Sequence, residues 1–235
     1  KQLYDTDPDK IASVNAQILG GLQQSAQLSA QLTVEGLTED ALTNAVLSQG
    51  VHTCAKALMP FDQGNRFPMI PYVRLVLEGN RLLNRDTDTI GLDTIDAPDG
   101  RHLASQRALS LVKGGIFDHV AGGFHRYTID HTWTVPHFEK MLYDNGLIME
   151  FLAESWQGGE QAPAIARAVD KTVDWLRREM RSPAGFFYAS KDADSFAEET
   201  APEPEEGNFY VWSYAELTRL LTEAELIELK MLFAI

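Results

Sequence analysis

Residues 114–145 read GGIFDHVAGGFHRYTIDHTWTVPHFEKMLYDN, and this stretch decides how the rest of the chain is interpreted. Four of the six histidines of the chain lie in it, six residues apart: His119, His125, His131 and His137. Six aromatic side chains lie among them. Between Gly115 and Pro136 the apolar residues follow no helical spacing. Disordered segments are poor in aromatics, so the aromatics of this stretch argue against disorder. We therefore predict an ordered loop that lines a pocket, followed by a helix that begins at Pro136.

The composition is that of a soluble globular protein, and 235 residues are enough to bury a sizeable core. We predict one helical domain over residues 1–235. The net charge is −14, and Lys and Arg cluster nowhere beyond residues 177–178, which argues against nucleic acid and anionic membrane surfaces as partners. No apolar run approaches the roughly 18 residues that a membrane-spanning helix needs.

The two ends of the chain indicate a piece of a longer protein. The sequence begins without an initiator Met or a signal-peptide pattern, and it ends inside an apolar, helix-like run at 231–235. We therefore expect both ends to be truncated and the protein to be cytoplasmic. A single cysteine, Cys54, excludes an internal disulfide framework and a site with several thiolate ligands.

Apolar residues spaced three and four apart predict a succession of helices around the central loop. The predicted helices cover residues 8–32, with a bend or an end at the glycine pair 20–21, and residues 38–59, 71–83, 101–113, 136–156, 163–180 and 214–221, the last capped by Ser213. Two aromatic runs, 185–190 and 208–213, are typical of strands and would pair as a hairpin closed by 191–207. The predicted fold class is all-α, with antiparallel helical hairpins and a small β-hairpin. Its long loops would collect at one end and form the site there.

The side chains of the two long loops suit a sugar. A pyranose site needs aromatic faces to stack on, and carboxylates or histidines that bind hydroxyls and move protons. The predicted catalytic residues are His125, His137, Glu139, Asp192 and Asp194. The predicted substrate-binding residues are Phe124, Arg126, Tyr127, Trp133 and Tyr143. We expect the first loop and the start of the helix at Pro136 to form one wall of a cleft, with the two aspartates opposite.

Other interpretations of the same residues stay open. Asp192 and Ser195 could serve only to cap a turn, and Glu139 could be placed in a first helical turn by the helix dipole alone. Histidines six apart do not make a zinc pair, and neither glycine pair is followed by the Gly-Lys-Ser/Thr of a phosphate loop. We predict no metal site and no cofactor, and we expect the glycine pairs to allow tight turns or close backbone packing.

Two parts of the chain resemble one protein family. Residues 114–144 resemble a GG-[aromatic or Ile]-DH…GGFHRY…W…VPHFEKMLYD string, and residues 185–195 with 206–212 resemble GFYSAxDADS followed by EGxFYVW. Both strings are found in the bacterial YyaL-like proteins and their animal relatives, the spermatogenesis-associated thioredoxin-domain proteins. The resemblance implies part of an (α/α)6 toroid similar to the six-hairpin glycosidases and the N-acylglucosamine 2-epimerases. The family's thioredoxin-like domain, with its Cys-x-x-Cys, does not occur in this chain.

The resemblance implies a carbohydrate-binding or carbohydrate-processing domain, with a sugar-like small molecule as ligand. The activity would be that of a sugar epimerase or isomerase, or of a glycoside hydrolase. The alternative is a non-catalytic module whose aromatic loops bind a partner, in particular the thioredoxin-like domain of the full-length protein. A toroid without its last hairpins would also expose a large apolar patch or self-associate.

Overall fold

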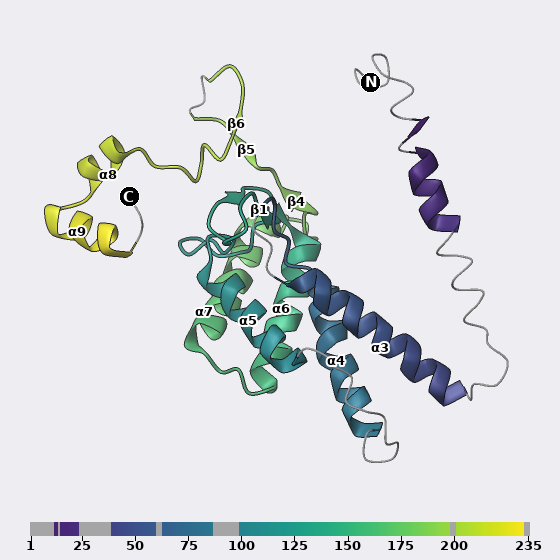
Figure 1. The fold of residues 1–235 in the computed structure, drawn as a ribbon. Coiled ribbons are helices and arrows are strands. Elements are labelled where there is room, and N and C mark those ends of the chain that lie inside the picture. The colour runs from purple at the N-terminus through teal and green to yellow at the C-terminus, as the bar shows by residue number, and fades with distance from the viewer. Residues whose placement is uncertain are drawn as a thin grey trace. The chain divides into compact units, whose positions relative to one another are not determined.

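The computed structural model describes residues 12–13, 15–23, 39–59, 63–86, 99–197 and 201–232. The chain divides into two compact units, residues 1–47 and 48–235, and the helix α3 (Glu39–Leu58) crosses the boundary. The described residues before α3 are helical and exposed, which agrees with the helix predicted there. The ends of that predicted helix lie outside the described residues. The structure is mostly helical, as predicted (Figure 1).

Four helices of the second unit pack side by side: α4 (Ile70–Asp86), α5 (Gly100–Lys113), α6 (Leu142–Gln157) and α7 (Pro163–Trp175), the last continued by a π-helical turn, η1 (Leu176–Met180). α4 contacts α5 and α6, and both of these contact α7 (Figure 1). A cavity of about 200 Å³ is lined by Arg81 near the end of α4, Arg101 at the start of α5 and Gly158 after α6. Consecutive helices therefore run antiparallel, and the long connections after α5 and after η1 leave from the other end.

The core lies where these helices meet, and its residues follow the helical period. The fully buried apolar side chains include Val73, Val76, Ala108, Leu111, Ile148, Phe151, Leu152, Ile165, Ala168 and Trp175. Apolar spacing predicts a buried stripe of Phe138, Leu142, Met149, Leu152 and Trp156 for the helix from Pro136, but Trp156 is about one third exposed while Ile148 and Phe151 are buried. For α7 the spacing predicts Ile165, Val169, Val173 and Leu176. Ile165 is buried, but the other buried residues of α7 are Ala168, Thr172 and Trp175.

The helix predicted from Pro136 begins only at Leu142. The intervening residues are extended: β2 (Pro136–His137) pairs with β1 (Tyr127–Thr128), and β3 (Lys140–Met141) pairs with β4 (Ser190–Lys191), both antiparallel. The Arg126 amide also donates to the Glu139 carbonyl at 2.9 Å. Pro136 suits a first helical turn, but these backbone hydrogen bonds to other segments replace the helical ones.

The predicted hairpin between 185–190 and 208–213 is wrong as well. Ser190 and Lys191 pair with β3, and β5 (Asp194–Ser195) pairs with β6 (Glu205–Glu206). Residues 208–212 form no strand, and the backbone of Phe187 bridges to Arg181. Alternation along a strand does not say which strand lies beside it, so the aromatic runs do not determine their partners.

The described chain ends in two short helices, α8 (Tyr214–Leu220) and α9 (Glu223–Leu232), which contact each other. Ser213 caps α8 as predicted, and the Glu216 side chain completes the reciprocal capping box. Among the described helices, none has both the length and the apolar character needed to cross a bilayer.

Candidate functional site

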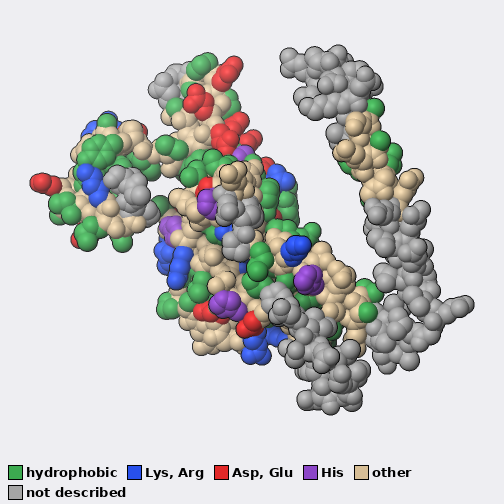
Figure 2. All heavy atoms as spheres, in the orientation of Figure 1, with side chains coloured by type: hydrophobic (Ala, Val, Ile, Leu, Met, Phe, Trp, Pro, Cys, Tyr) green, Lys and Arg blue, Asp and Glu red, His purple; other side chains and the backbone are tan. Residues whose placement is uncertain are grey.

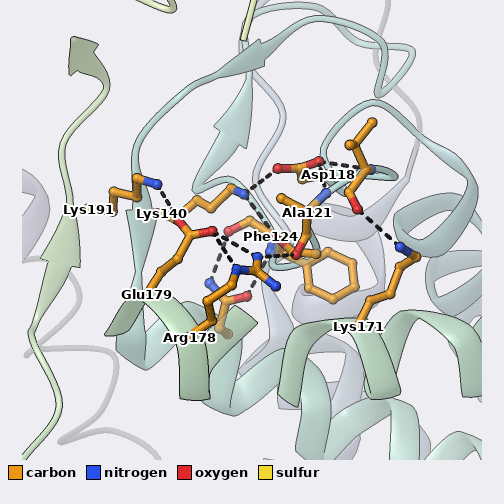
Figure 3. A network of polar contacts seen from close by, with 11 residues as sticks. Asp118, Ala121, Phe124, Lys140, Lys171, Arg178, Glu179 and Lys191 are labelled. Atoms are coloured by element: carbon orange, nitrogen blue, oxygen red, sulfur yellow. Dashed lines mark hydrogen bonds and ion pairs between the residues drawn. The ribbon is translucent and has the colours of Figure 1, made fainter. Parts of the chain in front are cut away.

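A buried ion pair joins β3 to the loop that follows α5 (Figure 3). The Lys140 ammonium donates to Asp118 Oδ2 at 2.7 Å and to the Gly122 carbonyl at 2.9 Å, and its side chain is 1% exposed. Burial raises the pKa of Asp118, but the Lys140 ammonium and two backbone amides more than offset this, so the pKa lies below its usual value. For Lys140, burial lowers the pKa of the ammonium by more than the Asp118 carboxylate raises it, so the pKa lies below its usual value. The pair fixes β3 to the loop that follows α5.

The second glycine pair, Gly122-Gly123, lets this loop lie directly on α7. Both residues have positive φ, and a Cβ on Gly123 would lie 2.7 Å from the ring of Trp175. Basic side chains from the helix then bind the loop carbonyls, with Lys171 donating to Val120 and Arg178 to Ala121 (Figure 3). The predicted close backbone packing is confirmed.

The buried Asn145 positions the segment that carries His125. Its Oδ1 accepts a hydrogen bond from the Phe124 amide at 2.7 Å, and its Nδ2 donates to the Phe124 carbonyl at 3.0 Å. Phe124 itself is fully buried and packs on Phe117. Phe124 is therefore part of the core in this conformation, and its backbone sets where His125 and Arg126 lie.

His125 lies inside the protein, with 2% of its surface exposed. Its ring meets the rings of Phe138 and Tyr210 edge to face, at 5.6 and 5.1 Å, and its Nδ1 has no hydrogen-bond partner among the described residues. Burial, reinforced by the Lys140 ammonium, lowers the pKa of His125 to about 3. The imidazole is therefore neutral near pH 7 and, in this conformation, a weak general base.

A second group of polar side chains lies nearer the surface, along the extended segment 136–141. Alternation along this segment puts His137 and Glu139 on one side. The His137 Nδ1 lies 2.6 Å from a carboxylate oxygen of Glu206, and Arg126 donates to Glu139 at 3.0 Å. The ring of Tyr127 stacks on His137 at 4.7 Å. This outer cluster joins both long connections, because Glu206 comes from β6, where acidic side chains gather (Figure 2).

Asp144, in the first turn of α6, lies beside Arg126 and Glu139 and belongs with them to the outer cluster. Burial raises its pKa to about 6, Glu139 adds to the rise, and Arg126 and the Tyr143 hydroxyl oppose it. One oxygen, Oδ2, is buried and has no hydrogen-bond partner among the described residues. The helix N-terminus favours the charged form, so the desolvation of this carboxyl outweighs a favourable dipole.

The remaining predicted site residues are Trp133, Asp192, Asp194 and Tyr143. Trp133 is buried, with the guanidinium groups of Arg66 and Arg107 over its ring at 4.8 and 5.2 Å. Asp192 and Asp194 are exposed, and the Asp192 carboxylate accepts a hydrogen bond from the Asp194 amide. That contact supports the turn-capping interpretation of Asp192. Tyr143 is half exposed beside Arg126 and Asp144.

Several functional candidates were missed from the sequence: Asp118, Lys140, Asp144, Glu206 and Tyr210. All of them lie inside the two strings that carry the family resemblance, which was the signal available. Residue type alone did not single them out, because their burial or their contact partners come from segments that are distant in the sequence. No group of three or more His, Cys, Asp or Glu in the described ranges is arranged to hold a metal ion.

Comparison with known proteins finds relatives that match about half of the chain. No family model matches it. Spermatogenesis-associated protein 20 of Homo sapiens is 37% identical over 132 residues, which are 55% of this chain and 16% of the human protein. The Mus musculus protein of the same name is 36% identical over the same shares. An uncharacterized protein of Caenorhabditis elegans is 31% identical over 130 residues, 55% of this chain and 18% of that protein.

The predicted family resemblance is confirmed. The matched segment spans about 16% of the length of the mammalian relatives, so an activity of the whole protein does not follow from the similarity. The names of these relatives state no reaction and no ligand.

Proposed function

We propose that the outer cluster is a binding site for a sugar-like molecule, and that its acid and base groups act on the bound ring. The helical hairpins α4–α7 would then be part of an (α/α)6 toroid, with the site at the end where the long connections lie. Antiparallel packing of consecutive helices and the meeting of both connections at β3 and β4 support this arrangement.

The observation that carries the proposal is the carboxyl of Asp144. Its pKa of about 6 leaves both protonation states populated near neutral pH, which is what a general acid or base requires. A carboxyl that served only stability would have its buried oxygen hydrogen-bonded, whereas Oδ2 is not. Arg126 and Tyr143 stand beside it and can orient a hydroxylated ligand.

The chemistry of the outer cluster and its surroundings fits a sugar better than an anion. Glu139 and Glu206 offer carboxylate acceptors, and the rings of Tyr143 and Phe67 are 52% and 44% exposed. Both faces of the Tyr127 ring are covered, by Phe67 and by His137. Within the described part of the cluster, Arg126 and a protonated His137 would carry the positive charge. Hydroxyls donate to carboxylates, and sugar rings stack on aromatic faces, so a neutral polyol is the ligand that this set accommodates.

Thermal-shift measurements with a sugar panel on the full chain test the proposal. Glucose, N-acetylglucosamine and maltose should be included, because a ligand that binds only the folded state raises its melting temperature in proportion to occupancy. Asp144→Asn should abolish the shift, while Asp174→Asn, at an exposed position of α7, should retain it. If no sugar shifts the wild type, or if Asp144→Asn responds like the wild type, the proposal is wrong.

A second candidate, a partner-binding module, is favoured by the exposed aromatics of the later connection. Phe186, Phe187, Tyr188, Phe209 and Trp212 are all 45% or more exposed. Exposed aromatics are typical anchors of protein interfaces, and the thioredoxin-like domain of the family is the partner to test. Calorimetric titration of that domain with wild type and with a Phe186→Ser/Trp212→Ser variant separates the candidates, because these changes leave the outer cluster intact.

A further inference from the structure

Residues 205–212, here called the strap, cross over the buried His125. The strap begins with β6, which pairs with β5, and it continues through a turn at Gly207. Gly207 has a φ of +78°, and a Cβ there would lie 2.5 Å from the ring of Phe138. Only a glycine therefore allows the strap to come this close to the segment that carries His137 and Glu139.

The Tyr210 side chain attaches the strap. Its ring stacks on Phe138 with centroids 5.2 Å apart and planes within 10°, and it meets His125 edge to face. The Lys140 ammonium lies 5.1 Å from the ring centroid. The neighbouring side chains of Phe209, Val211 and Trp212 are each more than half exposed. Tyr210 thus fills a recess formed by one aromatic face, one imidazole and one ammonium group.

The ring of Tyr210 is well packed in this recess, but its polar group is not hydrogen-bonded there. Its hydroxyl is buried and has no hydrogen-bond partner among the described residues, and the same holds for Nδ1 of His125. Lys140 directs two of its three N–H donors to Asp118 and Gly122, and its ammonium faces the rings of Tyr210 and Trp175. Buried polar groups without partners cost stability, and phenylalanine at 210 would avoid one of these costs. The recess therefore offers hydrogen-bonding capacity that Tyr210 does not use.

We propose that Tyr210 occupies an inner subsite lined by His125, Phe138 and Lys140, and that the strap lifts to admit the ring of a hydroxylated ligand. The inference rests on the proposed function for the class of ligand. A sugar ring would take the place of the phenol on the Phe138 face, and its hydroxyls would meet the His125 Nδ1 and the remaining Lys140 proton. Opening would also remove Glu206 from His137.

Hydrogen exchange on the full chain tests whether the strap opens by itself. The reporters are the Gly207 and Val211 amides, which are hydrogen-bonded to the carbonyls of Ala193 and Gly207. Tyr210→Ala should speed their exchange about tenfold or more, because the anchor is lost. Tyr210→Phe should slow it about fivefold, because the closed state no longer buries an unpaired hydroxyl. Trp212→Ala, at an exposed position, should leave both rates unchanged. Exchange that is as fast or faster in Tyr210→Phe would overturn the proposal.

The imidazole of His125 provides a second readout, by NMR titration. In the wild type it should stay neutral down to the pH at which the protein unfolds. In Tyr210→Ala, water reaches the ring, and the apparent pKa should rise towards the ordinary value of about 6.5, held somewhat lower by Lys140 and His137 and raised by Asp118. A His125 that still does not titrate in this variant would show that Tyr210 does not cover it, which would overturn the proposal.

Ligand binding then separates the strap from the proposed function. A sugar that binds the wild type should bind Tyr210→Ala more tightly, because the variant no longer spends binding free energy on opening. Equal affinity, with no change in exchange of the strap amides, would overturn the inner subsite. If no sugar binds either protein while exchange and titration behave as expected, the proposed sugar function is wrong and the opening strap stands.

Discussion

The two long connections of this protein meet at β3 and β4 but are held in different ways. The connection after α5 has a buried ion pair, two glycines pressed against α7 and an asparagine that binds Phe124 twice. In the connection after η1, residues 183–190 are all exposed, and Lys191 pairs with a partly exposed Glu179. The first connection is organised as part of the core, whereas the second rests on it.

This difference assigns separate tasks to the two connections. A site needs groups held within a fraction of an ångström, which buried and fully bonded segments provide. It also needs a way in, which segments with few buried contacts provide because they open at low cost in free energy. The first connection supplies His125, Arg126 and Glu139, and the second supplies the strap and Glu206.

A large difference between the connections should appear when their lysines are removed. Lys140→Met leaves the Asp118 carboxylate buried without its counter-ion, which should lower the free energy of unfolding by about 3–5 kcal/mol. Lys191→Met removes a partly exposed ion pair and should cost about 1 kcal/mol or less. Urea denaturation measures both. Similar losses for the two variants would contradict the distinction between the connections.

Glycine substitutions should give the next largest contrast. Gly123→Ala adds a Cβ against the Trp175 ring at a positive φ, which should destabilise the protein by about 2–4 kcal/mol through clash and backbone strain. Gly185 has a φ of +92° with open space around its Cβ position, so Gly185→Ala should cost only the strain, about 1 kcal/mol. The check is the melting temperature of each variant, and a larger effect at Gly185 would reverse the expected order.

The effect of Asp144 on the stability of the protein should depend on pH. Its folded-state pKa of about 6 exceeds the usual value near 4, so its ionisation destabilises the fold as the pH rises from about 4 through 6. Asp144→Asn should therefore match the wild type near pH 4 and exceed its stability by on the order of 1 kcal/mol at pH 7, allowing for solvent screening. The groups that face Asp144 are Arg126, Tyr143 and Glu139.

Denaturant midpoints of both proteins across this pH range provide the measurement. His125 contributes the opposite trend, because its pKa of about 3 makes the fold lose stability as the pH falls below about 6.5. The His125 contribution is the same in the wild type and in Asp144→Asn, so it cancels in the difference between their free energies of unfolding. A variant less stable than the wild type at pH 7 would mean that the carboxylate supports the fold instead of a function.

The smallest effect is expected at the exposed aromatics of the second connection. Phe187→Ala should change the free energy of unfolding by about 0.5 kcal/mol or less, because its ring is 46% exposed. Phe117→Ala, at a fully buried position of the first connection, is the matched control and should cost about 3–5 kcal/mol. Differential scanning calorimetry distinguishes the two, and equal losses would show that both connections belong to the core.

Local patterns in the sequence determined most of the helical framework. The helices around Val51, Val73, Leu111, Ile148 and Ile165 were predicted because apolar spacing and capping residues act within a few positions of one another. The Ser213 cap and the close packing of Gly122-Gly123 follow from equally short-range rules. The two aromatic connections were singled out as the candidate site because neither has a helical period, and ligand binding there stays a prediction.

Tertiary structure alone decided the pairing of segments and the chemistry of each side chain. Residues 136–141 are extended because their backbone pairs with β1 and with β4, about 50 positions later, which no local propensity encodes. His125 is neutral and Asp144 retains its proton to about pH 6 because other segments exclude water from them. Desolvation depends on every neighbour in space, and most of those neighbours are distant in the sequence.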